Sequence, residues 1–412
     1  MKMDAMTIEP AEINLRTATA IEPVLRIAAG RLPVIAFVDA DTERLLQESS
    51  VLPGRNQIIR GGIAKAIHYL SEQRSPHLLF VDISGVELPL SQVQMLADVC
   101  EPGTTVIAIG DHNDVALYRD LQEAGVSNYI VKPLTRELVT KALGPKTNGS
   151  GEMGRASALK LGKMVSFIGA RGGVGATTVA ANLAWHLANR QSRRVALVDL
   201  DLQHGDSNLL FNADTTPGLR DALANPLRLD PLLLERIMTQ HGERLFVLGG
   251  EEPIQEHVQF TPAAVDTLFS VLRSQFHYVI VDVPRIPTPA YRRALEIADR
   301  RVIVVDQTMR SMRDAVRLKK AFGDIPGAEQ AMFVLNREGE AGHHGLSLKE
   351  VTNVLQANPT STIPFLPKLV TSAAHHATVA ARQRKFGNAV GALALEISGR
   401  TRRRRWFSWR AK

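Results

Sequence analysis

Residues 164–190 read MVSFIGARGGVGATTVAANLAWHLANR, and this stretch decides the fold. It begins with an apolar run of strand length, continues through a loop of small residues and ends in a helix-like segment. Such a loop lets backbone N–H groups converge on phosphate oxygens, and the N-terminus of the helix adds a partial positive charge. The stretch therefore predicts a phosphate-binding unit inside an α/β domain.

The loop departs from the usual pattern G-x-x-x-x-G-K-[ST] where that pattern has its lysine. Ala176 stands at the lysine position and Ala170 at the first glycine, whereas Thr177 keeps the hydroxyl that would ligate Mg²⁺. The glycines that allow a tight turn remain, at Gly172, Gly173 and Gly175. Taken alone, the loop leaves open a plain glycine turn in a domain that binds no nucleotide.

Short apolar runs alternate with amphipathic stretches on both sides of this loop. They begin at residues 33, 77, 105 and 127 in the front half, and at residues 164, 193, 244, 277, 301 and 331 in the second half. Alternating strands and helices predict two doubly wound α/β domains with parallel sheets. We expect a disordered leader, a front domain, a linker, a second domain and a tail, at residues 1–31, 32–145, 146–163, 164–396 and 397–412.

The composition fits a globular protein, with 45% hydrophobic and 22% charged residues. No apolar run is long enough to span a membrane, no secretory signal is visible, and Cys100 is the only cysteine, so we expect a cytoplasmic location. The net charge is +7, and residues 400–412 alone carry seven basic residues, which leaves the rest of the chain balanced. Sequence-specific nucleic-acid binding is therefore not expected.

Polar residues follow several strands of the second half, where ligands bind in open α/β sheets. Asp199 and Asp201 follow one strand, Asp282 ends another, and Asn336 and Arg337 end a third. Each residue alone is explained by a solvated or capping role. Together, after the loop, they indicate a site for a nucleotide and a metal ion.

With RGGVGATT and these strand ends, residues 164–396 resemble the MinD/ParA branch of P-loop ATPases. The resemblance implies ATP and Mg²⁺ as cofactors. It implies a nucleotide-binding set of Gly172, Gly173, Val174, Gly175, Ala176, Thr177, Thr178, Asn336 and Arg337. The implied metal-binding residues are Thr177, Asp199 and Asp282.

The same resemblance implies catalytic roles for Asp201, which helps to position the attacking water, and for Arg171. The family has its signature lysine at the position of Arg171, and that lysine reaches across a nucleotide-sandwiched dimer. Ala176 removes a point charge from the β- and γ-phosphates, and the planar fork of an arginine does not replace a lysine. We therefore expect nucleotide binding with slow or absent hydrolysis, at most a weak ATPase.

The front domain resembles a receiver domain of the flavodoxin-like fold. Asp82 stands at the phospho-acceptor position, with Asp39 and Lys132 at two further positions of the receiver site. Ala40 replaces the second metal-binding acid, and Gly110 replaces the hydroxyl residue. These losses favour an interaction module that is not phosphorylated, and residual phosphorylation at Asp82 is the alternative.

The tail combines a cationic run with aromatic residues, at Arg402, Arg403, Arg404, Arg405, Trp406, Phe407 and Trp409. Basic and aromatic side chains suit an anionic membrane surface. Non-specific contact with DNA phosphates and a solvated end are the alternatives.

A receiver-like domain ahead of this deviant ATPase resembles the CpaE/TadZ family, as do RGGVGATT and LVDLDLQHGD. That resemblance implies an ATP-binding protein that positions or assembles a Flp/Tad-type (type IV secretion-like) pilus machinery. It implies a homodimer, Tad/Flp pilus assembly components as partners, and a place at the inner membrane or cell pole. The alternative is an active ParA/MinD-type ATPase in DNA partitioning or division-site placement.

Overall fold

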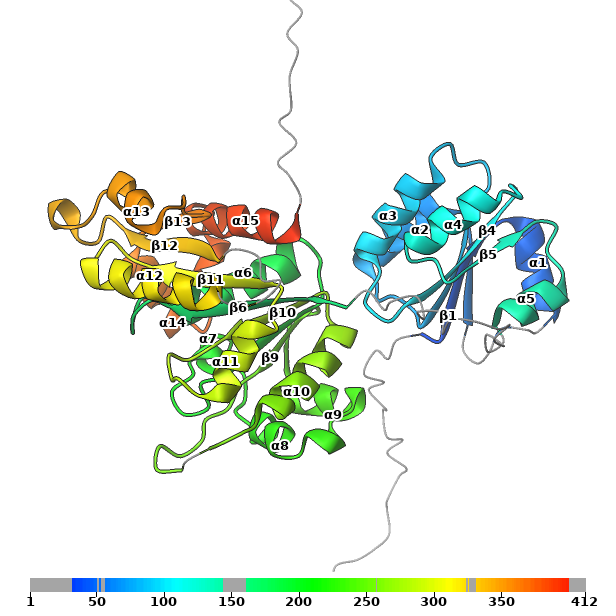
Figure 1. Cartoon of the computed structure of the whole chain (residues 1–412). Helices are drawn as coiled ribbons and strands as arrows, with labels where there is room; N and C mark the ends of the chain where they lie inside the picture. The colour runs from blue at the N-terminus through cyan, green and yellow to red at the C-terminus, as the bar shows by residue number, and fades with distance from the viewer. Residues whose placement is uncertain are drawn as a thin grey trace, which may run out of the picture.

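The computed structural model describes residues 32–49, 52, 56–143, 161–256, 258–323, 325 and 331–399. Two sheets, one parallel and one almost entirely parallel, organise these residues, and each has helices on both faces (Figure 1). The predicted leader, most of the predicted linker and most of the basic aromatic tail lie outside the described residues.

The front domain is a five-stranded parallel sheet in the order β2-β1-β3-β4-β5. Its elements are β1 (Val34–Val38), α1 (Ala40–Ser49), β2 (Asn56–Arg60), α2 (Ile63–Glu72), β3 (Leu78–Asp82), α3 (Pro89–Val99), β4 (Thr105–Gly110), α4 (Val115–Glu123), β5 (Asn128–Val131) and α5 (Arg136–Leu143). Helices α2, α3 and α4 bury their apolar sides on one face, and α1 and α5 cover the other. This strand order is that of flavodoxin-like sheets.

The second domain is an eight-stranded sheet in the order β13-β12-β11-β6-β10-β7-β9-β8. Its first half contains β6 (Lys163–Gly169), α6 (Ala176–Arg190), β7 (Val195–Asp199), α7 (Ser207–Leu210), α8 (Gly218–Ala224), η1 (Pro226–Arg228), α9 (Pro231–Ile237), β8 (Thr239–His241), β9 (Leu245–Leu248) and α10 (Pro262–Gln275). Its second half contains β10 (Tyr278–Asp282), α11 (Pro289–Glu296), β11 (Arg300–Val305), α12 (Met309–Gly323), β12 (Met332–Glu338), η2 (Gly342–His344), α13 (Leu348–Leu355), β13 (Ser361–Pro364), α14 (Pro367–His375), η3 (Ala380–Arg382) and α15 (Arg384–Ser398).

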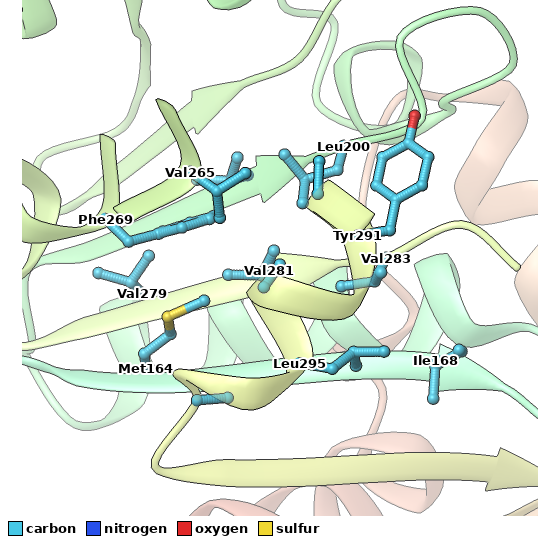
Figure 2. Packing of buried hydrophobic residues seen from close by; sticks show 14 of the residues in the cluster. Met164, Ile168, Leu200, Val265, Phe269, Val279, Val281, Val283, Tyr291 and Leu295 are labelled. Atoms are coloured by element: carbon cyan, nitrogen blue, oxygen red, sulfur yellow. The ribbon is translucent and has the colours of Figure 1, made fainter. Parts of the chain in front are cut away.

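The central strands of the second domain are buried on both faces, so that alternate residues enter two different cores. Met164 and Ile168 of β6 pack under α10 and α11, together with Val281 of β10 (Figure 2). Val165 and Phe167 point to the opposite core, which α6 and α15 cover. Burial on both faces explains why these strands read as continuous apolar runs.

The predicted fold class, two doubly wound α/β domains, is confirmed. The second sheet has one antiparallel pair that was not predicted, because β8 pairs antiparallel with β9 at the sheet edge. The connection between them is a tight turn through Gly242, whose φ is 72°, and a turn this short can join only antiparallel strands. The strands β2, β8 and β13 were not anticipated, because their sequences are short and carry polar residues.

Candidate functional site

The loop between β6 and α6 has the backbone of a phosphate-binding turn. Gly173 and Gly175 have φ values of 72° and 90°, a left-handed conformation that disfavours residues with a Cβ atom. A Cβ at Gly175 would lie 2.5 Å from Nδ2 of Asn336. That same amide donates a hydrogen bond of 2.8 Å to the carbonyl of Val174. Asn336 therefore braces the phosphate loop in this structure.

Thr177 lies in the first turn of α6, and its hydroxyl faces the sheet. Its Oγ1 donates a 2.5 Å hydrogen bond to Oδ2 of Asp282, which ends the buried strand β10. Burial, followed by the nearby Asp199 carboxylate, raises the pKa of Asp282 to about 8. The structure thus brings together the hydroxyl and the carboxylate that the sequence assigned to one metal ion.

Asp199 ends β7, the strand next to β10, and only 1% of it is exposed. Its carboxylate accepts hydrogen bonds from the backbone N–H groups of Asp201 and Ser207, at 3.1 and 3.2 Å. Burial raises its pKa to about 6. Among the described residues, neither Asp199 nor Asp282 forms a salt bridge with a basic side chain. Uncompensated buried acids beside a phosphate loop fit a site that receives a cation.

Asp201 is partly exposed and belongs to the turn that follows β7. Its Oδ1 accepts hydrogen bonds from the N–H groups of Gln203 and His204, at 3.4 and 3.0 Å. The carboxylate is therefore held at the mouth of the site by its own loop. Within the described ranges, histidine, cysteine and acidic side chains form no group of three that could hold a metal ion by themselves. A cation would need Thr177 and phosphate oxygens as further ligands.

Arg171 makes a contact that the sequence did not predict. Its Nε donates to Oδ2 of Asp306 at 2.7 Å, and a second guanidinium nitrogen contacts the same oxygen. The Asp306 side chain is 3% exposed and that of Arg171 is 27% exposed. The cation of the loop is thus paired within its own subunit. Asp306 ends the run VIVVD much as Asp282 ends VIVD, and that pattern was the available signal.

The remaining candidate residues occupy less specialised places. Ala176 is the first residue of α6 and packs partly against the core, and Thr178 offers its carbonyl to Asn182. Arg337 has a φ of 56° and pairs with Glu340 at 3.2 Å, on the surface. None of these contacts by itself indicates a nucleotide.

The front domain assembles its three predicted residues at the carboxyl ends of β1, β3 and β5. Lys132 Nζ lies 2.6 Å from Asp39 Oδ2 and 2.6 Å from Asp82 Oδ2. Although burial opposes it, hydrogen bonds from Lys132 and Thr42 together lower the pKa of Asp39 to about 2. A Cβ at Gly110 would lie 2.3 Å from the Tyr129 hydroxyl. Tyr129 therefore occupies the space in which a receiver needs its hydroxyl side chain.

The second domain resembles proteins of known family. Residues 162–330 match a family described as AAA domain. The septum site-determining protein MinD of Bacillus subtilis is 27% identical over 185 residues, which are 43% of this chain and 65% of that protein. The chain thus spans somewhat less than two thirds of that relative.

Two solved structures extend the comparison. MinD from Pyrococcus horikoshii, complexed with Mg-ADP, superposes with a TM-score of 0.51 at 22% identity, over 57% of this chain and 96% of that chain. A pilus assembly protein CpaE from Caulobacter crescentus is 33% identical over 28% of this chain and 98% of that chain, with a TM-score of 0.26. The second domain therefore has the MinD/ParA-like P-loop ATPase fold. None of the helices in the described ranges combines the length and hydropathy of a membrane span.

Proposed function

We propose that this protein binds ATP with Mg²⁺, hydrolyses it slowly or not at all, and works as a dimer joined through the nucleotide. In this role it positions or assembles a Flp/Tad-type pilus machinery. One observation carries the nucleotide part of the proposal. Thr177, Asp199 and Asp282 converge on a glycine-rich loop, and the buried acids have no basic partner among the described residues.

The donor set suits Mg²⁺, a hard cation that prefers oxygen ligands and commonly binds through one or two carboxylates and phosphate groups. Thr177 and Asp282 would hold the ion, and Asp199 would add negative charge behind them. When bound, Mg²⁺ supplies the positive charge that offsets the phosphates and the buried acids. The N–H groups of the loop and the N-terminus of α6 would bind the phosphates themselves.

Hydrolysis should be slow because the site lacks positive charge at the phosphates. A lysine at position 176 would supply a charge at the β- and γ-phosphates, and Ala176 cannot. The remaining cation of the loop, Arg171, is occupied by Asp306. Asp201 is left to orient a water molecule without a strong electrostatic partner. The site can therefore hold ATP as a switch more readily than it can cleave it.

The pilus role rests on the motifs that resemble the CpaE/TadZ family and on the order of the two domains. The Caulobacter crescentus protein corresponds to 28% of this chain, so the motifs carry this part of the proposal. The front domain would act as an unphosphorylated interaction module for Tad/Flp components, because Lys132 occupies both acids of its pocket. The proposed location is the cytoplasm, with the tail reaching the inner membrane or the cell pole.

Calorimetric titration of ATP and ADP in the presence of Mg²⁺ tests the nucleotide part. We expect micromolar ATP affinity, weakened at least tenfold in Thr177→Ala because a metal ligand is lost. Thr267→Ala removes a hydroxyl from α10, outside the site, and should bind as the wild type does. No binding by the wild type at millimolar ATP would refute the proposal.

Phosphate release tests slow turnover separately. Wild-type turnover should lie well below that of the Ala176→Lys variant, which restores the charge of the loop. Equal and rapid turnover in both would favour the active partitioning or division-site ATPase. Incubation with acetyl phosphate tests the front domain, and we expect no acid-labile phosphate at Asp82. Labelling that is lost in Asp82→Asn would contradict the interaction-module assignment.

A further inference from the structure

The two domains meet at the amino-terminal ends of their parallel strands. Glu101 precedes β4 in the front domain, and Arg194 and Arg244 precede β7 and β9 in the second domain. The phosphate loop and the pocket at Asp39 follow strands, at the opposite edges of the two sheets. Both candidate sites therefore face away from the contact between the domains.

Four charged side chains form an alternating ring across this contact. Glu101 lies 3.5 Å from Arg194 and 3.7 Å from Arg74, measured between carboxylate oxygens and guanidinium nitrogens. Glu235 of α9 lies 3.3 Å from Arg194 and 3.8 Å from Arg74, by the same measure. Arg74 and Glu101 come from the front domain, and Arg194 and Glu235 from the second. Each carboxylate thus contacts one arginine from each domain.

The centre of the ring is withdrawn from water. The side chains of Arg194 and Glu101 are 5% and 6% exposed. The Arg194 guanidinium also lies 4.7 Å from the ring centre of Phe246 and 4.8 Å from that of Phe276. Its flat faces meet aromatic rings and its edge meets carboxylates, an environment that suits arginine rather than lysine. Loss of Glu101 would leave the buried Arg194 with only the half-exposed Glu235, and loss of Arg194 would leave the buried Glu101 with only Arg74.

A second arginine crosses the contact independently of the ring. Nη2 of Arg244 donates to the carbonyl of Ser71 at 3.2 Å and also to that of Glu72, while Nη1 donates to Ser192 at 2.9 Å. Ser71 and Glu72 end α2, where unpaired carbonyls and the helix dipole favour a cation. The second domain therefore caps a helix of the front domain.

We propose that the charge ring and the Arg244 cap lock the front domain onto the nucleotide-binding domain as one rigid body. The front pocket then stays at a constant distance from the phosphate loop, whether or not nucleotide is bound. A nucleotide-joined dimer, as proposed above, would hold its two front domains at a fixed distance and orientation from each other. The lock itself needs no ATP, so its test stands apart from nucleotide binding.

Cys100 provides a native probe of this contact. It is the only cysteine of the chain, it is partly buried, and it caps the end of α3 beside Glu101. The His277 ring of the second domain lies against its backbone. The experiment measures the reaction rate of Cys100 with dithiobis(nitrobenzoate) in the full-length protein without nucleotide. The variants are Glu101→Gln, Arg194→Met and the double variant.

We expect each single variant to react about tenfold faster than the wild type, because breaking one buried pair exposes the contact. The double variant should react more slowly than independent effects predict, because it leaves no unpaired charge. Arg292→Met breaks a largely exposed i,i+4 ion pair on α11, away from this contact, and should react as the wild type does. Circular dichroism confirms that each variant is folded.

Calorimetry gives a second readout of the same lock. The wild type should melt in one transition, and Glu101→Gln should melt in two as the domains separate. Equal labelling rates in all variants, or two transitions already in the wild type, would overturn the proposal.

Discussion

Breaking the Arg171–Asp306 pair should have strongly asymmetric effects on stability. Arg171→Met keeps most of the aliphatic stem but leaves the Asp306 carboxylate, 3% exposed, without its cation. Loss of one partner of a buried pair costs about 3–5 kcal/mol. The hydroxyl of Thr308 still donates to Asp306 at 2.7 Å, so the lower end, about 3 kcal/mol, is expected.

The reverse change should be milder. Asp306→Asn removes the carboxylate and leaves Arg171, which is 27% exposed and can turn toward water. The cost is then that of hydrogen bonds to a charged group, about 1.5 kcal/mol. The double variant, Arg171→Met with Asp306→Asn, contains no uncompensated charge. It should be more stable than Arg171→Met alone, although it carries one more substitution.

Urea unfolding of the four proteins measures these free energies, provided that the denaturant slope stays constant. Arg292→Met, in which a largely exposed pair on α11 is broken, serves as the control and should match the wild type to within about 0.5 kcal/mol. Equal losses in the two single variants, or strictly additive losses in the double variant, would refute the reasoning. Such a result would mean that Arg171 is not committed to Asp306 before nucleotide binds.

Three further outcomes are expected. Burial lowers the pKa of His277 to about 3, whereas the pKa in the unfolded chain is about 6.5, so between these values only the unfolded chain takes up the proton. The free energy of unfolding should therefore fall by about 2 kcal/mol between pH 6.5 and 5. Urea unfolding at a series of pH values should show that this loss is absent in His277→Gln. Gly175→Ala, with φ at 90° and a Cβ 2.5 Å from the Asn336 amide, should cost about 1–2 kcal/mol in thermal unfolding, whereas Gly172→Ala meets no atom within 4 Å and should be neutral. Lys132→Met leaves two facing carboxylates without their cation and should lower the stability by about 2 kcal/mol, measured by urea unfolding of the full-length protein.

Periodicity could predict both sheets, because their central strands are buried on two faces and read as unbroken apolar runs. The residues at the ends of those strands could be predicted for the same reason. Asp199 and Asp282 end adjacent parallel strands, so knowledge of the sheet is enough to place them together. Thr177 follows from the loop that precedes its helix. These parts of the candidate site depend on local sequence and on one rule of topology.

The Arg171–Asp306 pair and the charge ring between the domains could not be predicted, because each joins residues that lie far apart in the chain. Arg171 and Asp306 are separated by 135 positions, and no local pattern links them. The ring between the domains joins Glu101 to Arg194 across a linker. Glu101 and Arg194 each look like an ordinary solvated charge in the sequence. Their role appears only when the domains are in contact, because burial makes their pairing necessary.

The distribution of charge around the altered loop determines how strongly nucleotide binding should depend on Mg²⁺. A lysine-bearing loop brings its own cation to the phosphates, but Ala176 is neutral and Arg171 is neutralised by Asp306. The buried Asp199 carboxylate adds negative charge at the same edge of the sheet. ATP alone would therefore meet only the N–H groups of the loop and a field that repels it. Nucleotide binding in this protein should consequently be controlled by Mg²⁺ to a greater extent than in a loop that keeps its lysine.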